Sequence, residues 1–358
     1  MPIRTSMVIQ SSMPSCEANR SRDVGGVVIG IESTAHTFSI GWVDGLGVPG
    51  KSVSAFVRPV EGGIHPREAA DHHAEHAGRI LRELLDNEVD IADVKAISYS
   101  QGPGLGPCLR IGASVARSLA TQLDVPLVGV NHCVAHIEVG RERCDCDDPV
   151  LLYASGGNTQ VIARLDGRYR VLGETLDIGI GNMLDKFARE QGIAFPGGPK
   201  IESLALEWLS ENPNPSLEGL ELPYAVQGMD LAFSGILNAA LNLVEKGAPL
   251  PAVCWSLQEH AFAACVEVAE RAMAHAGKSE LLLGGGVACN ERLRNMCDVM
   301  SLSRGATSHV PEKFLCIDNG SMIATLGRLQ LLWGTPTKLD ESGVRQDLRT
   351  DETPILWN

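Results

Sequence analysis

Two histidines stand four residues apart in "VNHCVAHIEVGR", residues 130–141. The segment follows an apolar run, so the pattern predicts a helix that begins where a strand ends, with Asn131 as its N-cap. Side chains four residues apart share one helix face, so His132 and His136 could bind one metal ion or share a solvated surface. Ligands bind at the carboxyl ends of strands in open α/β sheets, which favours a metal at this position.

A second histidine pair, His72 and His76, lies in a segment that is predicted to be helical over residues 67–86. Both residues fall opposite a stripe of apolar residues at helical spacing, so we expect them to face solvent. The members of that stripe are Ala70, Ala74, Ala77, Leu81 and Leu84. This pair is therefore predicted to be a solvated surface and not a metal site.

Two imidazoles need further ligands to hold a metal, and Tyr153 and Asp318 are candidates. Each also has a structural interpretation, because Tyr153 could be a core residue and Asp318 a helix N-cap. Metalloproteases with two histidines on one helix carry glutamate directly after the first histidine, whereas residue 133 is cysteine. The sequence therefore argues against that mode of peptide cleavage.

Two loops rich in small residues could bind a phosphate or a nucleoside. "SGGNT" (155–159) offers backbone N–H groups and hydroxyls with little bulk, although an ordinary hairpin turn has the same composition. "GGGVACN" (284–290) could let a base or ribose lie against its backbone, or could be a strand-to-helix turn that needs a positive φ. Neither loop contains a Walker lysine motif or GxGxxG, which removes two common nucleotide-binding motifs.

Strand and helix patterns alternate along the chain, which predicts an α/β fold. Strands are expected at 27–31, 38–43, 52–57, 95–100, 127–130 and 281–283, and further helices from about 109, at 258–275 and at 318–332. Two β-turn-β units, at 27–45 and 149–167, share one plan and both end in Asp-Gly. They indicate a duplicated fold with a ligand cleft between its halves, with chance similarity of two hairpins as the alternative.

Composition narrows the class of protein. The 358 residues are 44% hydrophobic and 21% charged, which is typical of a globular enzyme with room for two domains. The net charge of −14 disfavours unaided nucleic-acid binding, so an RNA substrate would require a local basic patch or a partner subunit. Ten cysteines occur without paired CxxC motifs, which predicts free thiols. No apolar run reaches the ~20 residues of a membrane helix and no secretion signal is present, so we expect a cytoplasmic protein.

Ten motifs, taken in order, give the chain a specific resemblance to a known family. They are "GIESTAHTFSIG", "EGGIHPREAADHHA", "SQGPGLGPCLRIG", "VNHCVAHIEVGR", "YASGGNT", "DIGIGNMLDKFAR", "FPGGPKIE", "MDLAFSGI", "GGGVACNERL" and "CIDNGSMIA". Over about residues 27–327 the chain resembles the universal tRNA threonylcarbamoyladenosine transferases. The similarity is to their archaeal and eukaryotic branch, the catalytic subunits of the KEOPS complex, formerly called O-sialoglycoprotein endopeptidases.

The resemblance implies a duplicated fold of the actin, sugar-kinase and heat-shock chaperone superfamily, with two lobes around a nucleotide cleft. In this chain we expect a disordered extension at 1–24 and lobe I at 25–130, completed by a C-terminal helix at 319–334. Lobe II, with the metal and nucleotide site, is expected at 131–318, and a tail at 335–358.

The resemblance also implies the site. One iron ion, or alternatively zinc, would be bound by His132, His136, Tyr153 and Asp318. The adenylate substrate, or ATP or AMP, would be held by Tyr153, Ala154, Ser155, Gly156, Gly157, Asp185, Gly198, Glu202 and Asn290. No residue is identified as a general base, and Lys186 and Arg189 could be either solvated charges or RNA contacts.

The activity implied is transfer of the threonylcarbamoyl group from threonylcarbamoyl-adenylate to N6 of the adenosine beside the anticodon, in tRNAs that read codons beginning with A. AMP is the other product. The partners implied are tRNA and the KEOPS subunits, including a separate small kinase, since a fused kinase is not expected in this chain. A metalloprotease and a nucleotide-dependent chaperone or kinase are the alternative functions.

Overall fold

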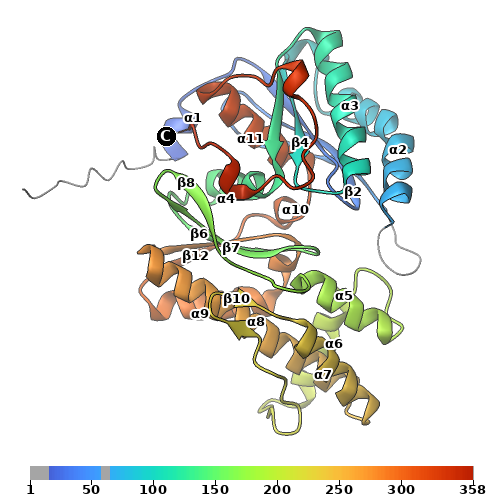
Figure 1. Ribbon diagram of the computed structural model, residues 1–358, viewed down its shortest axis with the longest axis vertical. Coiled ribbons are helices and arrows are strands. Elements are labelled where there is room, and N and C mark those ends of the chain that lie inside the picture. Colours follow the sequence, from blue (N-terminus) through green and yellow to red (C-terminus); the bar gives the residue numbers. More distant parts are fainter. Residues whose placement is uncertain (1–15, 58–64, 358) are drawn as a thin grey trace, which may run out of the picture.

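The computed structural model describes residues 16–57 and 65–357. Two five-stranded sheets with their helices form two lobes, one above the other (Figure 1). The first lobe contains the sheet β3-β2-β1-β4-β5, built from β1 (Val27–Glu32), β2 (Thr37–Val43), β3 (Val53–Phe56), β4 (Val94–Gly102) and β5 (Leu127–Asn131). The second lobe contains the sheet β12-β11-β6-β7-β8, built from β6 (Val150–Ala154), β7 (Thr159–Leu165), β8 (Arg168–Glu174), β11 (Glu280–Gly284) and β12 (Thr307–His309).

The two sheets follow the same plan. In the first lobe β1, β2 and β3 are antiparallel neighbours, and β4 and β5 continue the sheet parallel to β1. In the second lobe β6, β7 and β8 repeat the antiparallel part, and β11 and β12 repeat the parallel part. The predicted hairpins at 27–45 and 149–167 therefore occupy equivalent positions, which confirms that the fold is duplicated.

Helices cover both faces of the first sheet. Residues of a strand alternate between its faces, so Ile29 and Ile31 pack toward α2 (Pro66–Asn87) and α3 (Gly106–Leu123), while Val28 packs with Ala324 of α11 (Gly320–Trp333). Gly30 is required here, because a Cβ at this position would lie 2.2 Å from the Gly320 carbonyl oxygen. The close approach of α11 to β1 fixes the start of α11, where Asp318 lies.

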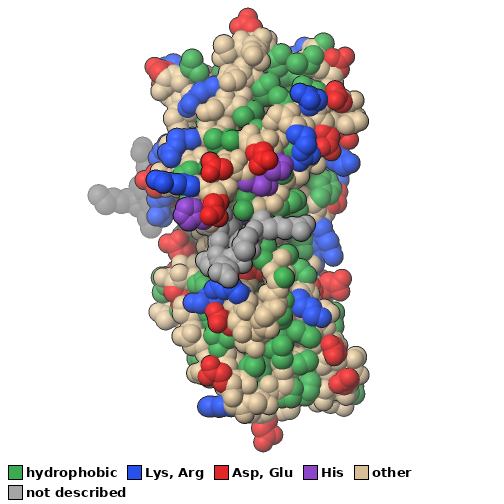
Figure 2. Space-filling view, turned by 90° about the vertical axis from the view of Figure 1, so that its right-hand side faces the viewer, with side chains coloured by type: hydrophobic (Ala, Val, Ile, Leu, Met, Phe, Trp, Pro, Cys, Tyr) green, Lys and Arg blue, Asp and Glu red, His purple; other side chains and the backbone are tan. Residues whose placement is uncertain are grey.

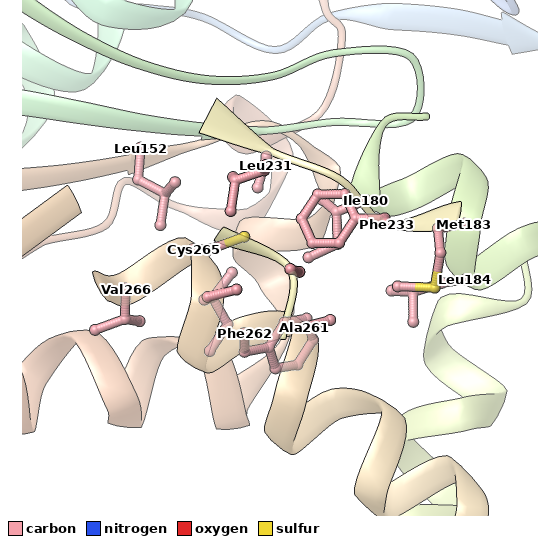
Figure 3. Close-up of a cluster of buried hydrophobic side chains, with 14 of the residues drawn as sticks. Leu152, Ile180, Met183, Leu184, Leu231, Phe233, Ala261, Phe262, Cys265 and Val266 are labelled. Atoms are coloured by element: carbon pink, nitrogen blue, oxygen red, sulfur yellow. The ribbon is translucent and has the colours of Figure 1, made fainter. Parts of the chain in front are cut away.

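The second lobe is built around one long buried helix, α8 (Leu250–Ala276), which begins before the predicted residue 258. Phe262 and Cys265 of this helix pack against Leu152 of the sheet and against Ile180 at the start of α5 (Figure 3). The other helices of this lobe are α5 (Ile180–Glu190), α6 (Gly198–Glu211), α7 (Ser234–Glu245) and α9 (Glu291–Ser303), with a small hairpin of β9 (Val226–Gln227) and β10 (Asp230–Leu231).

One helix, α4 (His132–Cys144), connects the two lobes. It follows β5 of the first lobe directly, and it packs against α11 and against β11 of the second. Nearly all of its side chains are buried, so an amphipathic pattern is absent. The short helix α10 (Lys313–Cys316) packs against α4 just before Asp318.

The expected disorder through residue 24 is wrong for residues 16–24; residues 1–15 lie outside the described part. Residues Cys16–Arg20 form the short helix α1. Asn19 is buried, and its Nδ2 donates to Glu142 Oε1 at 3.1 Å while its carbonyl accepts from Arg328 Nη2 at 2.9 Å. These polar contacts order the segment. A hydropathy pattern contains no information about such hydrogen bonds, so the sequence did not predict this order.

The prediction that His72 and His76 face solvent is only partly correct. Both side chains are half-buried, and their rings stack with centroids 4.1 Å apart. The buried face of α2 includes His73, whose Nε2 lies 3.0 Å from the Ala35 carbonyl oxygen, whereas Ala74 is exposed. Ala70, Ala77 and Leu84 of the predicted stripe are buried, so the stripe is largely correct, and it missed only the inner position that the hydrogen-bonded His73 takes.

The C-terminal tail packs across the ends of β4 and β5. Tyr99 donates its hydroxyl to the Ser342 carbonyl at 2.9 Å, and Asn131 Nδ2 donates to the Arg349 carbonyl at 3.1 Å. Trp357 is almost completely buried. None of the helices in residues 16–57 and 65–357 combines the length and apolarity that a membrane span requires.

Candidate metal centre

Three predicted ligands meet between the lobes. Asp318 Oδ1 lies 3.5 Å from His132 Nε2 and 3.3 Å from His136 Nε2. The three ligating atoms all lie within 4.8 Å of one another. Both histidines are buried, in the first turns of α4. Two imidazoles and a carboxylate from segments 182 residues apart therefore face one point.

Tyr153 of β6 is a core residue and also lies at the candidate metal centre. Its ring belongs to the buried cluster that joins α4, α11 and the second sheet, and its side chain is only 2% exposed. Its hydroxyl lies 3.2 Å from His132 Nε2, and its ring centroid lies 4.9 Å from that of His136. The phenol oxygen is therefore at the cluster while the ring packs in the core.

Helix caps position the cluster. The predicted cap Asn131 accepts from Cys133 N at 2.9 Å and Val134 N at 3.2 Å, which fixes the first turn of α4. The structural interpretation of Asp318 as an N-cap is wrong, because Asn319 accepts from Met322 N at 2.9 Å and caps α11. The carboxylate of Asp318 is thus left to face the imidazoles.

Glu32, which sequence reasoning did not select, supports the cluster from behind. It is fully buried, and its Oε2 accepts from His132 Nδ1 at 2.9 Å and from Ser100 Oγ at 2.5 Å. Its Oε1 accepts from Thr34 N at 2.7 Å. Because Nδ1 is bonded to this carboxylate, Nε2 is the ring nitrogen that faces the cluster, as for histidines whose other nitrogen bonds a carboxylate in metal sites. The available signal was a single charged residue in the apolar strand "VVIGIE".

The carboxylates of Glu32 and Asp318 place negative charge around the two imidazoles of the cluster. Burial alone lowers the pKa of His132, but the carboxylates of Glu32 and Asp318 outweigh it and raise the pKa to about 9. Burial lowers the pKa of His136. Burial raises the pKa of Asp318, yet the charge on His132 and the hydrogen bond from His136 bring it below its usual range. A cation at this point is therefore favoured.

The "SGGNT" segment forms a tight turn between β6 and β7. Its carbonyl groups accept from the first amides of α5, with Gly181 N donating to Ser155 O at 3.1 Å and Asn182 N donating to Gly156 O at 2.9 Å. Gly156 and Gly157 are exposed. The hairpin-turn interpretation is correct, and the exposed glycine backbone is also open to a ligand.

The "GGGVACN" segment is a strand-to-helix turn. Gly285 has φ +86°, and a Cβ there would lie 2.4 Å from the Ala154 carbonyl oxygen, so this loop packs against the "SGGNT" turn. Asn290 caps α9 by accepting from Arg292 N at 2.9 Å, and its Nδ2 donates to Gln258 Oε1 at 2.7 Å. The interpretation as a turn with a positive φ is confirmed.

The remaining candidates lie on α5, which carries Asp185, and in the first turns of α6, which carry Gly198 and Glu202. Asp185 Oδ1 accepts from Gly197 N at 2.7 Å, next to Gly198, and burial raises the pKa of its carboxyl. Glu202 Oε1 accepts from Glu291 N at 2.7 Å. Glu202 also lines a cavity of about 290 Å³ together with Pro199, Ser203, Leu206, Glu291 and Lys313. The exposed side chains of Lys186 and Arg189 make no contact with the cluster in the described residues.

A sequence model of the tRNA N6-adenosine threonylcarbamoyltransferase family (TsaD) matches residues 52–325. The protein of that name from Methanocella arvoryzae is 52% identical over 330 residues, which cover 92% of this chain and 98% of the relative. The chain belongs to this family. The Thermococcus kodakarensis member is 50% identical over 334 residues, covering 93% of this chain and 100% of the relative. The predicted family membership is confirmed.

Other members are longer. A bifunctional tRNA threonylcarbamoyladenosine biosynthesis protein of Methanothermobacter thermautotrophicus is 51% identical over 330 residues. The match covers 92% of this chain, and the chain spans 60% of that relative's length.

Solved structures establish the fold. HypF of T. kodakarensis aligns with a TM-score of 0.58 at 17% identity, over 90% of this chain and 49% of that one. Component A of the Acidaminococcus fermentans (R)-2-hydroxyglutaryl-CoA dehydratase aligns with a TM-score of 0.54 at 11% identity, over 86% and 99%. The predicted actin-like and sugar-kinase fold is confirmed.

Proposed function

We propose that this chain transfers the threonylcarbamoyl group from threonylcarbamoyl-adenylate to N6 of the adenosine beside the anticodon, in tRNAs that read codons beginning with A. The new bond joins N6 to the carbamoyl carbon, the mixed-anhydride bond to phosphate breaks, and AMP leaves with its electron pair while N6 loses a proton. The observation that carries the proposal is the convergence of His132, His136 and Asp318 in a member of this family.

We propose that His132, His136, Tyr153 and Asp318 hold one metal ion, iron in the first instance and zinc as the alternative. Imidazole, phenol and carboxylate donors without a thiolate suit these metals. When bound, the metal supplies Lewis-acid polarisation of the carbamoyl carbonyl or of the phosphate leaving group. Glu32 holds the His132 ring in the ligating orientation, which the 2.9 Å contact to Nδ1 supports. No side chain is assigned as a general base.

The adenylate is proposed to lie across the loops of the second lobe. Its ligands are Tyr153, Ala154, Ser155, Gly156, Gly157, Asp185, Gly198, Glu202 and Asn290. The exposed turn at Gly156 and the cavity beside Glu202 support this proposal. An exocyclic amine is a weak nucleophile, so holding it against the mixed anhydride supplies much of the rate.

The lobe boundaries and partners belong to the same proposal. Residues 25–130 with 319–334 form one lobe and residues 131–318 the other, with a nucleotide cleft between them. The net charge of −14 supports a requirement for partners to bind tRNA, and we propose the KEOPS subunits, including a separate small kinase, in the cytoplasm.

The test is nucleoside mass spectrometry after incubating the full chain and its partner proteins with unmodified tRNA and threonylcarbamoyl-adenylate. We expect the modified nucleoside with the wild-type chain. The double variant His132→Ala/His136→Ala should lose it, whereas the matched pair His72→Ala/His76→Ala should retain it. Modification that continues without the chain, or with the first double variant, contradicts the proposal.

A further inference from the structure

Three aromatic rings from both lobes meet beside the candidate metal centre. His36 lies in the turn between β1 and β2, Phe56 ends β3, and Phe195 lies in the loop between α5 and α6. The His36 ring centroid lies 6.2 Å from that of Phe56 and 6.2 Å from that of Phe195. On the face of the molecule shown in Figure 2, histidine side chains are exposed at two separate places on the first lobe, each beside carboxylates.

The two phenylalanines leave large apolar faces in solvent. Phe56 is 46% exposed and Phe195 is 41% exposed, and neither belongs to the buried core clusters of the described residues. Single exposed apolar residues need no explanation. Here, however, one residue from each lobe is held against the same imidazole, so the rings form a composite surface that no core requires.

Hydrogen bonds tie this aromatic surface to the site on both sides. On the first lobe, the turn that carries His36 begins at Glu32, whose Oε1 accepts from Thr34 N at 2.7 Å and whose Oε2 accepts from His132. On the second lobe, Gly197 N, two residues after Phe195, donates to Asp185.

We propose that His36, Phe56 and Phe195 form a stacking site for the acceptor adenine of the RNA. The inference rests on the proposed function and adds positioning residues for the acceptor. An enzyme that acts on a base must take it out of the stack, and single-stranded loops are recognised by stacking on aromatic side chains, histidine included. Stacking also supplies affinity that does not depend on phosphate contacts, which a chain of net charge −14 provides poorly.

The test compares Phe195→Leu, which removes the ring and keeps apolar bulk, with Phe195→Trp, which keeps a stacking surface. Tyr224→Leu is the matched control, because Tyr224 is an aromatic residue that is 69% exposed and contacts Glu267 of α8 away from this surface. Full-length protein with its metal and partner proteins is assayed on an anticodon stem-loop, with KM for the RNA and kcat determined separately. Binding of a stem-loop with 2-aminopurine at the acceptor position reports stacking directly.

We expect Phe195→Leu to raise KM for the RNA by about tenfold and to weaken the quenching of 2-aminopurine, since stacking on one aromatic ring contributes this much. Phe195→Trp should be close to wild type and Tyr224→Leu unchanged. Release of AMP by hydrolysis of threonylcarbamoyl-adenylate without RNA, in which water attacks the carbamoyl carbon in place of N6, should not change in any variant. Phe56→Leu provides a second, independent variant with the same expectation.

Wild-type KM and quenching in both leucine variants would overturn the stacking site. So would equal losses in the leucine and tryptophan variants, or a loss of AMP release without RNA, because these indicate a structural role. A wild-type protein that modifies no tRNA contradicts the proposed function instead. The quenching comparison still decides the stacking site in that case.

Discussion

At the scale of single residues, the carboxylate of Glu32 determines which nitrogen of His132 is available. Glu32 has no charged partner other than this imidazole among its hydrogen bonds in the described residues, since Ser100 and Thr34 are neutral. It therefore acts on the candidate metal through His132 and not by binding it. This makes Glu32 a positioning residue whose effect can be separated from that of a ligand.

Glu32→Gln is expected to weaken metal binding by about 10- to 100-fold without abolishing it, because an amide holds the imidazole less well than a carboxylate does. Metal affinity measured by chelator competition tests this. Glu174→Gln is the control, since Glu174 is half-buried in β8 and hydrogen-bonded to Gln160, outside the cluster. Equal metal affinity in wild type and Glu32→Gln would contradict the assigned role.

The sequence predicted the histidine pair and its cap, because spacing and capping are local properties. It named Tyr153 and Asp318 only as candidate ligands, each with a structural alternative. The resemblance assigned them to the pair, since no local rule connects residues on α4, β6 and the start of α11. Glu32 was missed because the partner that makes its burial favourable lies 100 residues away. Long-range polar pairing is the information that the residue pattern lacks.

At the scale of helices and strands, polar contacts fix the positions of some segments that hydrophobic periodicity does not predict. The five strands of the first sheet and β6, β7 and β11 of the second were predicted within a few residues, because alternation and apolar runs indicate burial, whereas β8 and β12 were not predicted. The helix α1 and the inner position of His73 on α2 were not predicted either, since Asn19 and His73 are buried polar residues. Asn19 and Nε2 of His73 have hydrogen-bond partners from distant segments.

Asn19→Ala is expected to lower the free energy of unfolding by about 1–3 kcal/mol, since it leaves a buried oxygen of Glu142 and the half-buried indole N–H of Trp333 without their hydrogen-bond partner. Chemical denaturation of the full chain measures this. Ser21→Ala is the control, because Ser21 is exposed on the same segment. If the two variants are equally stable, α1 does not hold α4 and α11 together.

The start of α7 depends on a carboxylate from another segment. Asp177 accepts from Ile178 N at 2.6 Å, Phe233 N at 2.9 Å and Ser234 N at 2.9 Å. Burial acts to raise the pKa of Asp177, but the hydrogen bonds from Ser234, Phe233 and Ile178 more than offset it and the pKa is lowered.

Asp177→Ala is expected to reduce the free energy of unfolding by about 1 kcal/mol near neutral pH, as for the loss of a helix cap. A carboxyl whose pKa is lowered on folding stabilises the protein above its unfolded pKa of about 3.9. The difference between wild type and variant should therefore be constant above about pH 5 and shrink as pH falls below 4. Denaturation at several pH values measures it; a difference that does not depend on pH would contradict this account.

At the scale of the whole molecule, the two lobes have equivalent sheet topologies but contribute different parts of the candidate metal centre. The candidate ligands lie on α4, which connects the lobes, on β6 of the second lobe, and before α11, which packs on the first sheet. A metal at this point would join both lobes. The duplicated topology was predicted from two hairpins, whereas the position of α4 between the lobes required the structure.

Removal of the metal is expected to lower the thermal stability of the full chain, and reloading should restore it. Metal at a hundredfold excess over its dissociation constant contributes about 2.7 kcal/mol. Thermal denaturation with and without metal measures the difference, and Asp318→Asn should abolish most of it. A metal-dependent rise in Tm that persists in this variant would place the ion elsewhere.

The most direct test of the account is the position of the metal itself. Anomalous diffraction from crystals of the metal-loaded protein, collected at the iron and zinc absorption edges, locates the ion and identifies it. The account predicts one strong peak within about 2.3 Å of His132 Nε2, His136 Nε2 and oxygens of Tyr153 and Asp318. A peak bound by other residues, or an active protein without a peak between these four side chains, would contradict it.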